Sequence, residues 1–68
     1  MTTREKIQSW LNSIERDIQL MQQYCDHKRE VEDWHGVMDA AADLRELLVT
    51  QRTLQTVLDF IEVKNANV

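Results

Sequence analysis

Apolar side chains recur at helical spacing near the start of the chain. Steps of four and three residues separate Ile7, Leu11, Ile14, Ile18, Met21 and Cys25. This spacing places side chains on one face of an α-helix, where they can meet a partner helix. Just before them, Thr2 and Glu5 have the spacing of a capping box at a helix N-terminus. We therefore expect a first helix over about residues 3–28.

The residues from Asp26 to Asp33 form a polar interval, in which seven of the eight are charged or histidine. A second apolar line follows it, at the positions Val37, Ala40, Leu44, Leu47, Gln51, Leu54, Leu58 and Ile61. Gln51 is the one polar residue of this line. A neighbouring line of Trp34, Ala41 and Leu48 widens this face. Asp33 is a suitable N-cap. We expect a second helix over about residues 33–63.

These two amphipathic helices predict an all-α fold, with residues 1–68 as a single antiparallel hairpin domain. Two helices in contact hide only one apolar line each, and a chain this short is marginally stable alone. The additional apolar groups therefore favour a homodimer, in which two hairpins form a four-helix bundle. The residues expected in the dimer core are Ile7, Leu11, Ile14, Ile18, Met21, Val37, Ala41, Leu44, Leu48, Leu54 and Leu58.

The charge of the chain is uneven. Its net charge is −4, and residues 26–46 contain the surplus, with seven acidic residues against three basic ones. A negative region of this kind can steer a basic partner surface, although a solvated helix face is the simpler alternative. Neither helix has the Lys and Arg stripe of a nucleic-acid-binding helix. We expect no direct contact with nucleic acid.

No combination of residues predicts catalysis. Neither Ser9 nor Ser13 has a histidine at helical spacing, and the one glycine excludes a glycine-rich phosphate loop. Glu32 and His35 have the Glu-x-x-His spacing of di-metal bundles, but Glu32 lies beside the predicted turn rather than in a bundle core. We therefore expect a protein without enzymatic activity, metal or cofactor.

Cysteine content and hydropathy predict where the chain functions. The single cysteine, Cys25, cannot form an internal disulfide, which favours a reducing compartment. Its place among the apolar positions of the first helix predicts a buried side chain. No apolar run reaches the ~18–20 residues of a membrane span, and no signal peptide is visible. A cytoplasmic protein that does not enter the membrane is expected.

Large side chains outside the two main apolar lines gather in sequence around the predicted turn. Aromatic anchors surrounded by charge are typical of protein-binding hot spots. The alternative is that these groups pack in the dimer interface. The hypothetical partner-binding residues are Tyr24, Val31, Trp34, Met38 and Asp39.

The segment DWHGVMDAAADLRE, residues 33–46, resembles a stretch of small phage-encoded helical-hairpin proteins. The length, the amphipathic first helix and the polar turn are also similar to that group. Its best-described kind is the anti-quorum-sensing (Aqs-type) protein of temperate phages. The resemblance implies a dimeric hairpin that binds a LuxR-type, LasR-like transcription activator and blocks its DNA binding. It also implies binding to the type IV pilus assembly ATPase.

We therefore expect a phage protein that inhibits a host regulator in the host cytoplasm. In this reading, the acidic region of residues 26–46 faces basic residues of the activator, and Tyr24, Trp34 and Met38 provide apolar anchors. One alternative is a structural or assembly subunit that forms a helical homo-oligomer. A metal-binding four-helix bundle is the least favoured alternative.

Overall fold

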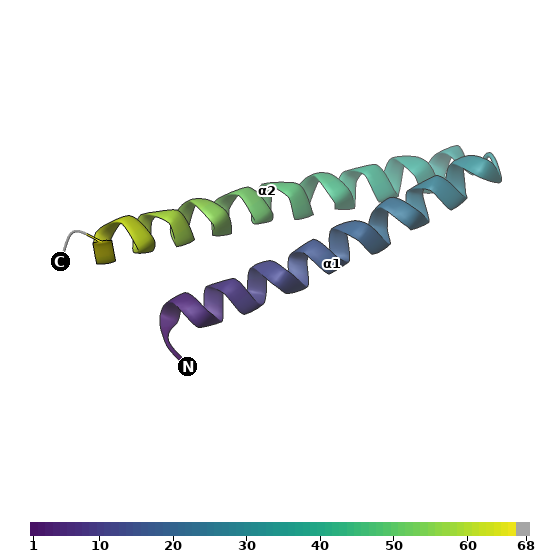
Figure 1. Ribbon diagram of the computed structural model, residues 1–68. Coiled ribbons are helices and arrows are strands. Elements are labelled where there is room, and N and C mark those ends of the chain that lie inside the picture. The colour runs from purple at the N-terminus through teal and green to yellow at the C-terminus, as the bar shows by residue number, and fades with distance from the viewer. Residues whose placement is uncertain (67–68) are drawn as a thin grey trace.

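The computed structural model, which describes residues 1–66, contains two long helices joined by a short turn (Figure 1). Helix α1 spans Thr3–Glu30 and helix α2 spans Trp34–Ala66. The helices pack against each other as an antiparallel hairpin measuring 54 × 18 × 12 Å, which confirms the expected all-α hairpin. Helix α1 ends two residues later than expected, and α2 starts one residue later and ends three later.

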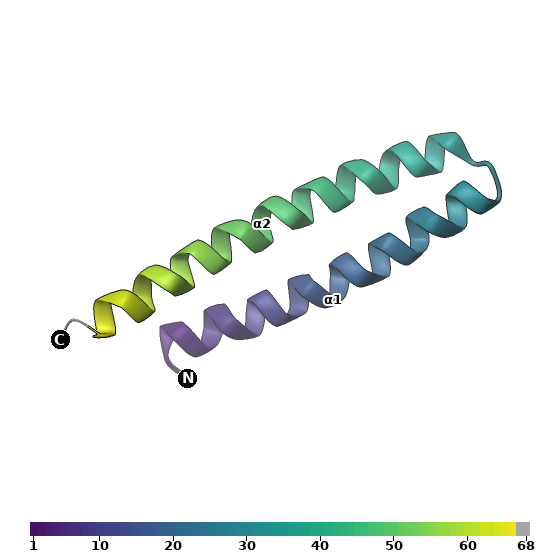
Figure 2. The same ribbon diagram turned by 45° about the horizontal axis from the view of Figure 1, so that its top comes forward.

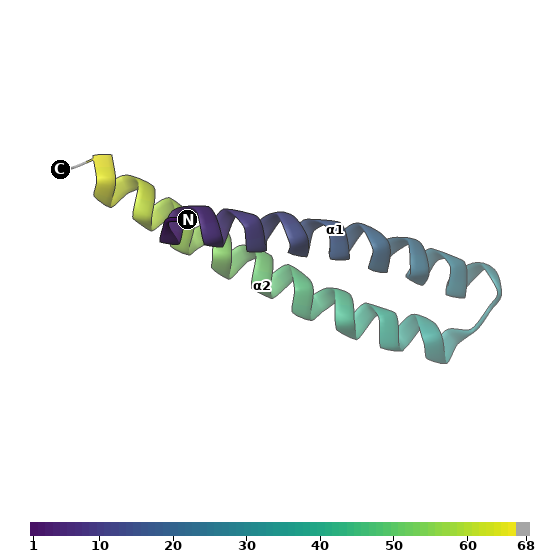
Figure 3. The same ribbon diagram turned by 90° about the horizontal axis from the view of Figure 1, so that it is seen from below.

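The two helices are inclined to each other rather than parallel. They run side by side in Figures 1 and 2, and their outlines cross near the N-terminus in Figure 3. In all three views the C-terminal end of α2 projects beyond the start of α1. Phe60 and Val63 are exposed near this end of α2.

A narrow apolar core lies between the helices. Its buried members come from the two predicted apolar lines and are Leu11, Ile14, Ile18, Leu54 and Leu58. The partly buried side chains of Ile7, Leu44 and Leu47 pack against them. Ala40 is also buried, and its short side chain permits close approach of the helices. Within the described residues, neither helix has a stretch long and apolar enough to cross a membrane.

Helix α1 begins with the predicted capping box. The Glu5 N–H donates to Thr2 Oγ1 at 3.1 Å, and the Thr2 N–H donates to Glu5 Oε1 at 3.4 Å. These bonds satisfy N–H groups that have no partner within the helix. Nearby, Arg4 pairs with Glu62 at 2.9 Å and connects the start of α1 to the end of α2. Because both side chains are about half exposed, this pair contributes at most about 1 kcal/mol.

Helix α1 ends in a Schellman motif, which makes the turn short. The Asp33 N–H donates to the Lys28 carbonyl at 2.9 Å, and the Glu32 N–H donates to the Arg29 carbonyl at 3.1 Å. This geometry needs a left-handed residue, and Glu32 has a φ of 57°. Glycine is usual at this position because it has no Cβ. The hairpin therefore places a strained glutamate at its turn.

Asp33 caps α2, as expected, and also holds the end of α1. Its Oδ1 accepts a hydrogen bond from the Gly36 N–H at 3.0 Å, and its Oδ2 lies 3.3 Å from Lys28 Nζ. A Cβ on Gly36 would lie 2.8 Å from Asp33 Oδ2, so glycine leaves room for this carboxylate. The Gly36 hydrogen bond, followed by Lys28, lowers the pKa of Asp33. The hydrogen bond with Asp33 raises the pKa of Lys28.

We predict that Glu32→Gly stabilises the hairpin by about 1 kcal/mol, because glycine adopts the left-handed backbone without a Cβ penalty. Urea unfolding followed by circular dichroism measures the change. The matched control is Glu30→Gly, which introduces the same residue in the last turn of α1 and should destabilise by up to about 1 kcal/mol. An unchanged or lower midpoint for Glu32→Gly would contradict the strained conformation of Glu32.

We also predict a pH-dependent effect of Asp33→Asn, which keeps an acceptor for the Gly36 N–H but removes the charge facing Lys28. Because folding lowers the pKa of Asp33, its charged form stabilises the hairpin above the ordinary aspartate value of about 3.9. That stabilisation is lost as the pH falls through the folded-state value. The Tm difference between wild type and variant should therefore be clear at pH 7 and shrink toward pH 2.

Thermal unfolding at both pH values measures this difference. The control is Asp43→Asn, since Asp43 lies on the exposed surface away from the turn and outside the ion pairs of the described side chains. Its Tm difference from wild type should be small at both pH values. If the Tm difference between wild type and Asp33→Asn were as large at pH 2 as at pH 7, the charge of Asp33 would not stabilise the turn.

Candidate protein-binding surfaces

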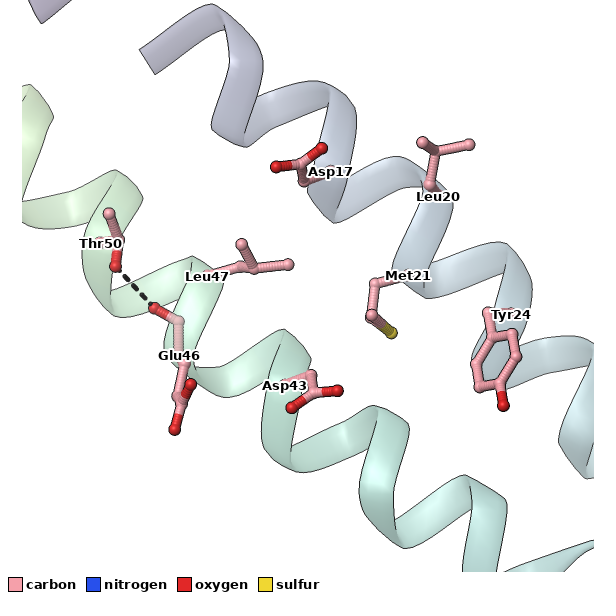
Figure 4. Close-up of a pocket in the computed structure, with 8 residues that line it drawn as sticks. All are labelled: Asp17, Leu20, Met21, Tyr24, Asp43, Glu46, Leu47 and Thr50. Carbon is pink, nitrogen blue, oxygen red and sulfur yellow. Dashed lines mark hydrogen bonds between the residues drawn. The ribbon is translucent and has the colours of Figure 1, made fainter. Parts of the chain in front are cut away.

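A groove of about 630 Å³ runs between the helices near the middle of the hairpin (Figure 4). We call it the acidic groove. It is lined by two turns of each helix: Asp17, Leu20, Met21 and Tyr24 of α1, and Asp43, Glu46, Leu47 and Thr50 of α2. In Figure 4, Met21 and Leu47 point toward each other between the helices. The groove is therefore an open surface feature that lies over the side of the apolar core.

The floor of the acidic groove is apolar. Met21 and Leu47 are half-buried, whereas Leu20 is 63% exposed and Tyr24 is 49% exposed. Lys28 Nζ lies 5.3 Å from the centroid of the Tyr24 ring, within the range of a cation–π interaction. Exposed apolar and aromatic side chains above a packed floor are suited to anchoring a protein partner.

Three carboxylates surround this floor, from Asp17, Asp43 and Glu46. All three residues are exposed, and among the described side chains none of them belongs to an ion pair. Asp17 lies outside the acidic region recognised in the sequence, and packing of α1 on α2 brings it to the groove. In the sequence, the pattern that could have indicated a place for Asp17 beside Tyr24 was its position midway between Trp10 and Tyr24, seven residues from each. The groove presents negative charge to a partner.

A second groove, which we call the basic groove, lies on the other side of α2. It is lined by Cys25, Ala41, Leu44, Arg45, Leu48, Val49 and Arg52. This lining contains two arginines and no acidic residue. Trp34 is on the same helical line as Ala41 and Leu48 at seven-residue spacing. Helix α2 therefore separates a negative surface from a positive one.

Cys25 is half-buried rather than fully buried as expected. The reason is its position at the edge of the helix contact, where its side chain lines the basic groove. The apolar line of α1 thus reaches the surface near its end.

The five residues expected to bind a partner are all exposed but do not form one surface. Tyr24 lines the acidic groove, whereas Trp34 lies on the helical line of the basic groove, with Met38 one turn further along α2. Val31 is in the turn, and Asp39 is on the acidic side of α2, four residues before Asp43. Successive helical residues rotate by about 100°, so neighbours in sequence face different directions.

The residues expected in the dimer core divide into two groups. Most are buried or half-buried within the single hairpin: Ile7, Leu11, Ile14, Ile18, Met21, Val37, Leu44, Leu54 and Leu58. The other two, Ala41 and Leu48, are exposed and line the basic groove. Ala41 and Leu48 are thus the exposed members of the set.

The two residues with metal-ligand spacing lie apart from both grooves. Glu32 occupies the turn, and His35 Nε2 lies 3.9 Å from the Asp39 carboxylate on the exposed surface. Over residues 1–66, no group of three or more His, Cys, Asp or Glu side chains could hold a metal ion. The residues that line the two grooves offer apolar contact and charge.

The segment of residues 33–46 contributes both to the fold and to the two grooves. Asp33 caps α2 and Ala40 packs in the helix contact, while Ala41 lines the basic groove and Asp43 the acidic groove. The exposed members of the segment lie outside the buried core.

Compared with protein-family models, curated proteins and solved structures, the chain matches none. The resemblance to the phage helical-hairpin proteins thus rests on residues 33–46, the length of the chain, the amphipathic first helix and the polar turn.

Proposed function

We propose that this chain is a dimeric, non-enzymatic phage protein that binds a host LuxR-type transcription activator and blocks its DNA binding. The observation that carries the proposal is the acidic groove, which has an apolar floor and three carboxylates at its rim. Among the described side chains, none of these carboxylates belongs to an ion pair. DNA-binding surfaces present Lys and Arg to phosphates. A negative groove is complementary to such a surface and competes with DNA for it.

The floor and the rim have different roles in this complex. Charge complementarity mainly guides encounter and orientation, whereas buried apolar anchors supply most of the binding free energy. Leu20 and Tyr24 are already exposed in the free hairpin, so a partner can cover them without disturbing the core. Burial of a fully exposed large apolar side chain contributes roughly 1.5–3 kcal/mol, and Leu20 and Tyr24 contribute less because part of each is already covered.

The basic groove supports the second part of the proposal, which is that two hairpins form the dimer. Leu48 is 43% exposed, Val49 58% and Trp34 59%, so α2 presents an apolar line to water. A two-fold dimer covers this apolar patch on both copies, and the long side chains of Arg45 and Arg52 can extend past its edge so that their like charges stay in water. The acidic groove lies on the other side of α2, so each copy keeps it free for a partner.

The class of partner comes from the resemblance of residues 33–46, which also adds the type IV pilus assembly ATPase as a second partner. A structural or assembly subunit would use the same dimer surface. It would have no reason to compete with DNA for an activator, so a competition experiment separates the two functions.

We predict that Asp43→Lys/Glu46→Lys weakens inhibition of the activator at least about tenfold, because two attractive rim charges become repulsive. Fluorescence anisotropy of labelled operator DNA bound to a purified LuxR-type activator measures the inhibition. Glu15→Lys/Asp59→Lys makes the same charge change at exposed positions outside the acidic groove and outside residues 26–46, and should inhibit like wild type. Wild-type protein that leaves the DNA complex intact at large excess would refute the proposal.

We predict that Leu48→Glu converts the dimer to a monomer, because it places a charge on the apolar line of the basic groove. Size exclusion with light scattering should give wild type about twice the chain mass of 8.1 kDa, and the variant about that mass itself. Leu20→Glu is the matched control in the other groove. It should keep the dimer mass and lose inhibition of the activator.

The two leucines thus test the two surfaces separately. Both are exposed on the hairpin, so neither change should unfold it, and circular dichroism checks the helix content. A Leu48→Glu protein that keeps the dimer mass would show that the basic groove does not join the two copies.

A further inference from the structure

We infer that the acidic groove receives an α-helix of its partner, with apolar residues facing the floor and Lys or Arg residues along both edges. This inference rests on the proposed function, since it concerns the same groove. It adds the conformation and the sequence pattern of the segment that binds there.

The length of the groove corresponds to two turns of a third helix. Its lining runs from Asp17 to Tyr24 on α1 and from Asp43 to Thr50 on α2, which is about 10 Å of each helix at ~1.5 Å per residue. The two sides come from neighbouring helices, as Figure 4 shows. A helix lying along them would present positions i, i+3 or i+4, and i+7 to the floor. The result is a three-helix arrangement with ordinary packing.

Backbone hydrogen bonding favours a helix over an extended segment. Both sides of the groove are α-helical, so their backbone N–H and C=O groups are already paired within α1 and α2. An extended segment would place its own peptide groups on the apolar floor without partners, which is unfavourable. A helix satisfies its backbone internally and exposes only side chains to the groove.

The carboxylates determine the charge of the bound helix. Asp43 and Glu46 are three residues apart on one side, and Asp17 is on the other. Asp39 continues the row on α2 at helical spacing. Long Lys or Arg side chains on both edges of the bound helix can lay their apolar stems along the groove and place their charges at these carboxylates.

A second copy of this chain is the competing occupant. Its α2 carries Arg45 and Arg52 seven residues apart, with Leu48 and Val49 between them. Docking of that surface into the acidic groove would join different patches on the two copies, and such contacts extend into open chains unless they close into a ring. A closed dimer through the basic groove avoids this, so we assign the acidic groove to a partner.

The test uses the full-length protein and a fluorescein-labelled synthetic peptide of about 18 residues. The peptide has leucines at positions i, i+3 or i+4 and i+7, and lysines on both flanks. We expect saturable binding by fluorescence anisotropy and an increase in helix content by circular dichroism on mixing. Two control peptides, one with leucines moved off helical spacing and one with Glu in place of Lys, should bind at least about tenfold more weakly.

Variants of the protein locate the bound peptide. Asp43→Lys/Glu46→Lys and Leu20→Ala/Tyr24→Ala should each weaken binding at least about tenfold. Glu15→Lys/Asp59→Lys matches the charge change outside the groove, and Phe60→Ala/Val63→Ala matches the double truncation at exposed positions outside both grooves. Both controls should bind like wild type.

Each other outcome has a definite meaning. Equal binding of the peptide with displaced leucines would overturn the helical inference. The protein could also inhibit the activator through Asp43 and Glu46 and yet fail to bind the basic peptide. That result would overturn the helical inference and leave the proposed function intact. Binding of the helix without inhibition of the activator would support the inference and reject the proposed partner. Loss of the dimer mass in Asp43→Lys/Glu46→Lys would assign the groove to a second copy and overturn the inference.

Discussion

Two helices in contact can bury only one face of each, and this limit governs the rest of the hairpin. The contact between α1 and α2 uses a narrow core around Leu11 and Leu58. Large apolar side chains remain in water on both sides of α2, with Leu20 and Tyr24 on one side and Leu48 on the other. Because a hairpin of this size is close to the lower limit of independent stability, surfaces of this kind favour further association.

Charge gives the two exposed sides different characters. Asp43 and Glu46 lie on one side of α2, and Arg45 and Arg52 lie on the other, although these residues alternate along a short stretch of sequence. The helical rotation separates them. One helix can therefore serve two partners, with the basic groove joining two copies in our proposal and the acidic groove left for the activator.

Much of the local structure could be predicted from short-range patterns. The capping box of Thr2, the cap at Asp33 and the two apolar lines all appear in the structure. The left-handed turn residue was not predictable, because Glu32 stands where glycine is usual. The candidate site was only partly predicted, since Tyr24 and Trp34 were grouped by sequence and lie on different surfaces.

The sequence by itself determined the two helices, the caps at their N-termini and their apolar faces, because helical periodicity and capping act between residues that are close along the chain. Only the tertiary structure decided which surfaces form between the helices. The short turn sets how α1 and α2 align, and this alignment brings Asp17 alongside Asp43 and Glu46. A groove that draws on residues so distant in sequence depends on packing between helices, which no local pattern encodes.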